Sequence, residues 1–186
     1  MAVKVAINGF GRIGRLAFRQ MFGAEGFEIV AINDLTSPKM LAHLLKYDST
    51  QGKYELADKV SAGEDSITVD GKEIKIYAKA NAAELPWGEI GVDVVLECTG
   101  FYTSKAKAQA HIDAGAKHVI ISAPAGNDLP TIVYNVNHTQ LTKDDAIILQ
   151  LLVQQTVLHQ WLRLLMILYR SNLVSCAQSM LTQVIR

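Results

Sequence analysis

The sequence predicts an α/β fold with a doubly wound, mostly parallel sheet and a small antiparallel hairpin. Two observations predict it. Short apolar runs alternate with amphipathic segments of helical length, which is the pattern of strands joined by crossover helices. The first apolar run also breaks into closely spaced glycines and then into a helical pattern, which favours a sheet with a ligand site at its carboxyl edge.

The first strand and the glycines after it follow the spacing of a dinucleotide-binding turn. The apolar run at 3–8 leads into Gly9, Gly11 and Gly14, and an amphipathic helical pattern continues to Phe22. Gly9 suits the tight turn, Gly11 lets the backbone approach a pyrophosphate, and Gly14 lets the helix pack closely on the sheet. A strand–turn–helix unit of this kind predicts a phosphate-binding site at the helix start.

The second strand ends on an acid. The apolar run at 28–34 closes on Asp34, twenty positions after Gly14. An acid at this place accepts hydrogen bonds from a ribose 2′-hydroxyl and repels a 2′-phosphate. Free N–H groups at the helix start, including those of Arg12 and Ile13, point at the phosphates. The sequence therefore predicts a Rossmann-like domain that binds NAD rather than NADP.

The later segments complete the sheet. Helical periodicity predicts the helices, and nearly continuous apolar runs predict strands covered on both faces. Asp70-Gly71 between two alternating runs predicts a tight hairpin, and Gly115 ends a helix. In chain order we expect a helix at 39–47, a hairpin at 68–76, a strand at 92–98, a helix at 105–114, a strand at 117–121, and short strands at 131–134 and 146–148.

Three further site residues follow predicted strands. Thr99 and Gly100 come directly after the strand at 92–98, and Ser122 comes after the strand at 117–121. Ligands of doubly wound sheets lie beyond the carboxyl ends of the strands. We therefore predict that these three residues lie beside the dinucleotide.

Charge and cysteine content exclude several classes of function. The 18 basic and 18 acidic residues cancel, so no long-range field attracts nucleic acid or an anionic membrane. Two cysteines and the lack of a secretory signal favour a cytoplasmic location. No spacing predicts a metal site, and we expect surface or helix-face positions for the histidines, which are His43, His111, His118, His138 and His159.

Several motifs carry a specific resemblance. They are Asn-Gly-Phe-Gly-Arg-Ile-Gly-Arg at 8–15, Ile-Asn-Asp-Leu at 32–35, Leu-Leu-Lys-Tyr-Asp-Ser at 44–49, Glu-Cys-Thr-Gly-Phe-Tyr at 97–102 and Ile-Ser-Ala-Pro at 121–124. Together they resemble the cofactor domain of phosphorylating glyceraldehyde-3-phosphate dehydrogenase, up to about Ile148. The resemblance implies NAD as cofactor, a homotetramer, a glycolytic role, and a main-chain contact from Lys79-Ala80 near the adenine. Erythrose-4-phosphate dehydrogenase shares this domain, so either sugar-phosphate aldehyde fits the resemblance.

The resemblance also implies chemistry for which this chain has no matching residues. In the family a cysteine thiolate attacks the aldehyde, a histidine serves as base, and phosphate releases the acyl group. The family motif Ser-Gly-Ala-Ser-Cys-Thr-Thr-Asn-Cys is replaced here from Leu149 onward. We interpret Cys98 as a structural residue of its strand, and Cys176 has no base placed beside it. We therefore assign no catalytic residue and expect this chain to bind NAD at most, without the sugar phosphate.

The last segment has a different composition. No acidic residue follows Asp145, and no glycine or proline follows Pro130. Codons can be chosen for residues 152–164 that encode, in another frame, Cys-Thr-Thr-Asn-Cys and then Ala-Pro-Met-Ala-Lys-Ala, both family motifs. We interpret 1–148 as the NAD-binding domain and 149–186 as a frameshifted apolar tail, helical or poorly ordered, in place of the missing catalytic domain.

Three interpretations of the whole chain stay open. The first is a truncated dehydrogenase that binds NAD and does not assemble as a native homotetramer. The second is a non-enzymatic fragment whose leucine-rich tail docks on intact subunits or other partners. The third is a sequencing error in an ordinary active enzyme. Polar residues interrupt the apolar tail, so we do not expect the tail to span a membrane.

Overall fold

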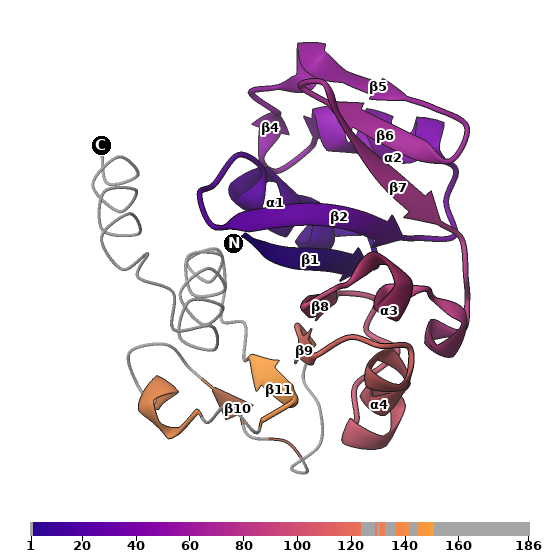
Figure 1. The fold of residues 1–186 in the computed structure, drawn as a ribbon. Coiled ribbons are helices and arrows are strands. Elements are labelled where there is room, and N and C mark those ends of the chain that lie inside the picture. The colour runs from indigo at the N-terminus through magenta and orange to yellow at the C-terminus, as the bar shows by residue number, and fades with distance from the viewer. Residues whose placement is uncertain (1, 124–128, 130, 133–136, 142–144, 151–186) are drawn as a thin grey trace.

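One sheet organises the part of the chain that the structure describes (Figure 1). The structure is a computed structural model that describes residues 2–123, 129, 131–132, 137–141 and 145–150. Within these ranges the sheet has nine strands in the order β10-β11-β9-β8-β1-β2-β7-β6-β5. The strands are β1 (Val3–Asn8), β2 (Phe27–Asn33), β5 (Val60–Ala62), β6 (Ser66–Val69), β7 (Lys72–Tyr77), β8 (Val94–Glu97), β9 (His118–Ile121), β10 (Thr131–Ile132) and β11 (Ile147–Gln150).

The sheet is parallel from β10 to β7 and antiparallel at its other end. β1 pairs in parallel with β2 on one side and with β8 on the other, whereas β5, β6 and β7 pair antiparallel. The hairpin between β6 and β7 turns at Asp70 and Gly71, which both have positive φ, as Asp-Gly predicts. The chain winds in opposite directions on the two sides of β1. The carboxyl end of β1 is therefore a topological switch point, where such sheets bind ligands.

Helices cover both faces of this sheet. α1 (Arg12–Met21) and α2 (Pro38–Lys46) contribute to one core, and α3 (Trp87–Ile90) and α4 (Lys105–Asp113) contribute to the other. Alternate residues of β1 enter the two cores, since Ile7 packs in the core of Phe18 and Ala6 in that of Trp87. Each large apolar side chain buried in this way contributes about 1.5–3 kcal/mol. The predicted doubly wound α/β fold is confirmed.

Most predicted elements are present, and the differences are short elements. The sequence did not predict β5, the α3 turn, or the two-stranded sheet of β3 (Tyr47–Asp48) and β4 (Gly52–Lys53). Single-turn 3₁₀ helices at Ala57–Lys59, Ala82–Glu84 and His138–Gln140 were also not predicted. Elements of two to four residues carry too few side chains to show a periodic pattern.

The end of the described chain differs slightly from the predicted boundary. β11 runs to Gln150, two residues beyond 148, and Leu149 pairs with Ile121 and is buried. The hydrogen bonds between strands join main-chain groups and do not depend on the side chain, so an apolar residue such as Leu149 can continue the strand. Of the strand expected at 131–134 the structure describes residues 131–132, and the expected tail from 151 onward lies outside the described residues.

Candidate dinucleotide-binding site

A cavity of about 670 Å³ opens where the central parallel strands end. Its walls come from the turn after β1, from the ends of β2 and β8, and from the segments that follow β7 and β8. It is lined by Asn8, Gly9, Gly11, Asn33, Asp34, Leu35, Lys79, Ala80, Cys98, Thr99, Phe101, Tyr102 and Lys107. The position at the switch point of the sheet agrees with the predicted ligand site.

Two of the three glycines are required by close packing. Gly9 has φ of +90°, and a Cβ there would lie 2.8 Å from the backbone N of Thr99. A Cβ on Gly14 would lie 2.2 Å from the carbonyl O of Gly9, so only glycine lets α1 begin this close to the turn. These contacts place the start of α1 against the ends of β1 and β8.

Gly11 differs from the other two glycines, because a Cβ there would meet no protein atom within 4 Å. Gly11 lines the cavity and is the N-cap residue of α1, where no side chain caps the helix. The first N–H groups of a helix lack intrahelical partners, and the helix dipole favours an anion beside them. No acidic residue occupies the first turn of α1. The space beside Gly11 is therefore free for an anionic ligand group.

Asp34 lines the cavity and also holds the glycine turn together. Its Oδ2 accepts a hydrogen bond of 2.8 Å from the N–H of Phe10, and its Oδ1 accepts one of 2.9 Å from the N–H of Thr36. A carboxylate offers about four lone-pair sites, so two backbone donors leave capacity for ribose hydroxyls. The carboxylate is thereby fixed in position beside the glycine turn.

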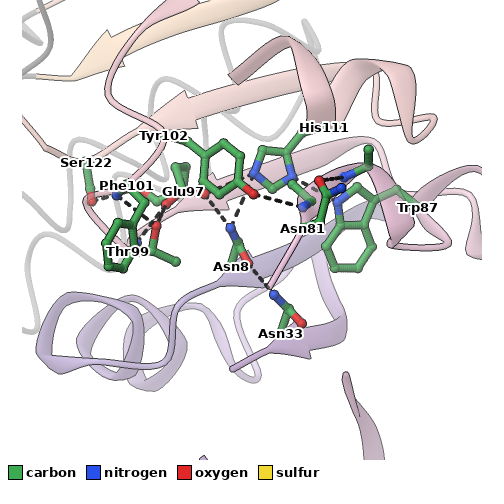
Figure 2. A network of polar contacts seen from close by, with 12 residues as sticks. Asn8, Asn33, Asn81, Trp87, Glu97, Thr99, Phe101, Tyr102, His111 and Ser122 are labelled. Atoms are coloured by element: carbon green, nitrogen blue, oxygen red, sulfur yellow. Dashed lines mark hydrogen bonds and ion pairs between the residues drawn. The ribbon is translucent and has the colours of Figure 1, made fainter. Parts of the chain in front are cut away.

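The predicted site residues divide into those that line the cavity and those that do not. Gly9, Gly11, Asp34, Thr99 and the Lys79-Ala80 segment line it. Ser122 does not, because its buried hydroxyl donates a 2.8 Å hydrogen bond to the carbonyl O of Glu97 (Figure 2) and ties β9 to β8. The other predicted residues outside the lining are Arg12, Ile13, Gly14 and Gly100.

Apolar residues of the cavity were not singled out from the sequence. The side chains of Leu35 and Phe101 are 70% and 77% exposed although both are large and apolar. Leu35 comes two residues after the end of β2, Phe101 comes four residues after the end of β8, and both line the cavity. One sequence feature could have identified them. A large apolar residue just after a strand, where it cannot belong to the core, indicates a ligand-facing position.

The main chain of the Lys79-Ala80 segment is already hydrogen-bonded within the protein. The N–H of Lys79 donates to Asn33 Oδ1 and its carbonyl accepts from Asn33 Nδ2, both at 2.9 Å. The Tyr102 hydroxyl donates to the carbonyl of Ala80 at 3.2 Å. The segment is therefore held in place at the wall of the cavity.

His111 is a correction to the expectation of a surface position. It is completely buried on the inner side of α4, where its ring contacts Glu97 and Trp87 (Figure 2). The helix has little amphipathic patterning, since small alanines occupy both sides, and the sequence therefore did not reveal the buried face. Of the others, His43 is exposed, His118 is half-buried, and the side chains of His138 and His159 lie outside the described residues.

Cys98 has the properties of a structural cysteine. Burial raises the pKa of its thiol to about 12, and a hydrogen bond with Ser122 only partly opposes that rise. A thiol with this pKa stays protonated near neutral pH and is a poor nucleophile. Cys176, the other cysteine, lies outside the described residues.

The raised pKa gives a testable prediction for the Cys176→Ser variant, in which Cys98 is the one remaining cysteine. Because burial favours the neutral thiol, the folded protein contains far less thiolate near neutral pH than a cysteine with the ordinary pKa of 9.0 would. We expect iodoacetamide labelling to be slow near neutral pH and to accelerate as the pH approaches 12. Rapid labelling of the folded protein near neutral pH would contradict this assignment.

The described residues contain neither a metal-binding cluster nor a membrane-spanning helix. No group of three or more His, Cys, Asp or Glu side chains in them is arranged to hold a metal ion. No helix of the described ranges combines the length and the apolar character needed to cross a membrane.

Comparisons with known proteins give the family. Residues 3–105 match the family described as glyceraldehyde 3-phosphate dehydrogenase, NAD binding domain. A glyceraldehyde-3-phosphate dehydrogenase of Lactobacillus delbrueckii subsp. bulgaricus is 63% identical over 153 residues, which are 80% of this chain and 45% of that protein. The corresponding proteins of Clostridium pasteurianum and Lactococcus lactis subsp. lactis are 60% and 52% identical, over 78% and 80% of this chain and 43% and 44% of theirs.

The chain thus spans less than half the length of these relatives. The matched residues contain the glycine turn, Asp34 and every residue of the cavity lining except Lys107, so the comparisons and the geometry agree on the same part of the chain. The chain belongs to the glyceraldehyde 3-phosphate dehydrogenase family, and residues 3–105 lie in the NAD-binding domain of that family.

Proposed function

We propose that the cavity at the carboxyl ends of β1, β2 and β8 holds NAD with its pyrophosphate beside Gly11. The free space beside Gly11 at the start of α1 carries the proposal, because a Cβ at that position would meet no protein atom within 4 Å. Backbone N–H groups of Arg12 and Ile13 face the phosphates. Asp34 accepts from the ribose hydroxyls, and Thr99 forms the opposite wall of the site. Ser122 supports that wall from behind by tying β9 to β8.

The adenine half of the site follows from the apolar walls. Leu35 and Phe101 are exposed side chains that line the cavity, and a purine ring covers such surfaces favourably. The Lys79-Ala80 segment lies at the same cavity. We assign these four residues to the adenosine and the glycine turn to the pyrophosphate.

The whole-protein activity that the relatives suggest is oxidative phosphorylation of glyceraldehyde 3-phosphate, with erythrose 4-phosphate as the alternative aldehyde. NAD, when bound, supplies the hydride acceptor for that oxidation. The domain binds and orients the dinucleotide, whereas the cysteine nucleophile and histidine base of the family have no counterpart at their expected places in this chain. We propose that the chain with this sequence binds NAD and does not oxidise aldehyde.

The tail proposal rests on sequence alone. Residues 1–148 make up about four fifths of the chain, which equals the 78–80% that the three relatives cover. This agreement supports a change of reading frame near 149. We also propose a cytoplasmic location, and we propose that a chain with this sequence does not form the family's native homotetramer.

The mass of the protein isolated from its source tests the tail. A mass of 20.4 kDa with peptides from 151–186 would support a genuine shifted tail. A far larger mass with a Cys-Thr-Thr-Asn-Cys peptide would show that the displayed tail is a sequencing error. Aldehyde oxidation by the 20.4 kDa chain would overturn the proposed inactivity.

Asp34 gives the test of cofactor choice. In the Asp34→Ser variant we expect NAD affinity to fall about tenfold and NADP affinity to rise about tenfold, because one charged acceptor and its repulsion are both lost. Asp65→Ser removes an exposed acid elsewhere on the surface and is the matched control, with both affinities unchanged. Calorimetric titration with each dinucleotide measures the change. Equal NADP affinity in the Asp34→Ser variant and the unmodified chain would contradict the role of Asp34.

A further inference from the structure

A network of polar side chains, several of them buried, connects residues of the cavity wall to Trp87 and His111, which are not in its lining (Figure 2). Glu97 and Asn8 are each 1% exposed, and His111 is completely buried. Burying a carboxylate is costly unless its lone pairs are satisfied. The partners of these buried groups show which parts of the site the network holds in place.

Glu97 is satisfied on both of its oxygens. Oε2 accepts from Asn8 Nδ2 and lies 3.0 Å from His111 Nε2. Oε1 accepts from the N–H of Thr99 at 2.7 Å and from the Thr99 hydroxyl. Thr99 lines the cavity, so the carboxylate fixes both the backbone and the hydroxyl of one wall residue.

The network then crosses to two more strand ends. Asn8 Oδ1 accepts a 2.7 Å hydrogen bond from Asn33 Nδ2, and the Asn33 carboxamide pairs with both main-chain groups of Lys79. Asn8 precedes Gly9, Asn33 precedes Asp34, and Lys79 lines the cavity. One continuous chain of hydrogen bonds therefore joins the ends of β8, β1 and β2 to the segment after β7.

Trp87 fixes the tautomer of His111. The indole Nε1–H lies 3.1 Å from His111 Nδ1, and an indole nitrogen is a donor only. His111 Nδ1 therefore accepts, and the proton of the neutral ring is on Nε2, directed at Glu97. Asn8 Nδ2 lies 3.3 Å from His111 Nε2. Both nitrogens are donors, so this contact is not a hydrogen bond, and both donate to Glu97 Oε2 instead.

From this geometry we propose that Glu97 is a positioning residue for NAD binding, oriented by His111 and acting through Asn8, Asn33 and Thr99. The proposal rests on the proposed dinucleotide site. Glu97 is not in the lining of the cavity; it holds the strand ends in the arrangement that the dinucleotide requires before binding. Preorganisation of this kind raises affinity because less order has to be imposed on binding.

The test uses a donor–acceptor exchange. Glu97→Gln places a carboxamide where Asn8, His111 and Thr99 all donate, so at least one donor pair is opposed. Asn8→Asp combined with Glu97→Gln supplies a new carboxylate that can accept from the new carboxamide, from His111 and from Asn33. We expect Glu97→Gln to weaken NAD binding by about tenfold, and the double variant to restore it to within about threefold.

A second pair of variants changes His111, which does not line the cavity. His111→Leu removes the donor to Glu97, whereas His111→Gln offers a carboxamide that can both donate to Glu97 and accept from Trp87. We expect about fivefold weaker NAD binding for the leucine variant and near-normal binding for the glutamine variant. His43→Leu, at an exposed histidine of α2, is the control and leaves affinity unchanged. These variants keep the test decisive if Glu97→Gln does not fold.

Amide hydrogen exchange separates this inference from the proposed function. Without dinucleotide, exchange at Thr99 and Lys79 should accelerate about tenfold in His111→Leu and stay normal in His111→Gln. If the unmodified chain binds no NAD but exchange changes in this way, the cavity assignment fails and the network stands. If folded Glu97→Gln and His111→Leu bind NAD like the unmodified chain, or if the double variant restores nothing, Glu97 has no positioning role.

Discussion

Gly11→Val should weaken NAD binding severely while leaving the fold intact. The valine side chain would occupy the space beside Gly11, which no protein atom approaches within 4 Å. Gly11 has φ of −70°, so a β-branched residue fits the backbone there without left-handed strain. Loss of the pyrophosphate position removes several charge-assisted hydrogen bonds, and we expect at least about a hundredfold weaker binding.

The experiment compares Gly11→Ala, Gly11→Val and the unmodified chain by calorimetric titration with NAD. The alanine variant should give an intermediate affinity, because its side chain fills part of the same space. Adenosine lacks the pyrophosphate and should bind all three proteins alike. Unchanged NAD affinity in folded Gly11→Val would show that the pyrophosphate lies elsewhere.

Gly14→Ala should destabilise the domain strongly, although alanine normally favours a helix. In an exposed helix the change would stabilise by about 1 kcal/mol. Here the added Cβ would lie 2.2 Å from the carbonyl O of Gly9 and 3.2 Å from Ile7 Cγ2. Relief of that overlap requires α1 to move away from β1, and we expect a net loss of about 2–4 kcal/mol.

Urea denaturation measures that loss as a lower midpoint. Gln20→Ala, at an exposed position of the same helix, controls for helix propensity and should change stability by less than about 0.5 kcal/mol. NAD binding to Gly14→Ala should weaken as well, because the helix start moves with the turn. An equal or higher urea midpoint for Gly14→Ala would disprove the close contact between α1 and the turn.

The central strands, the main helices and the glycine turn could be predicted because each has a local cause. Periodicity marks α1 and α2, continuous apolar residues mark β8, and Asp-Gly at 70–71 marks the hairpin. Gly9, Gly11 and Asp34 could be placed together because the carboxyl ends of neighbouring parallel strands meet at one edge. These predictions needed no knowledge of contacts between distant residues.

The buried network behind the site could not be predicted, because its causes are contacts between residues that are distant in the sequence. Glu97, Asn8 and His111 are polar residues in segments whose neighbours are apolar, and only their pairing in three dimensions explains their burial. His111 in particular comes from α4, fourteen residues after Glu97. Ser122 shows the converse, because a residue at a strand end was expected to face the ligand and instead bonds a neighbouring strand.

Calorimetric titration of the full chain with NAD, and separately with NADP, tests the central claim most directly. The account predicts one NAD site per chain with an affinity on the order of micromolar, and NADP binding about a hundredfold weaker. A chain that is folded by circular dichroism but binds neither dinucleotide, or binds both equally, would contradict it.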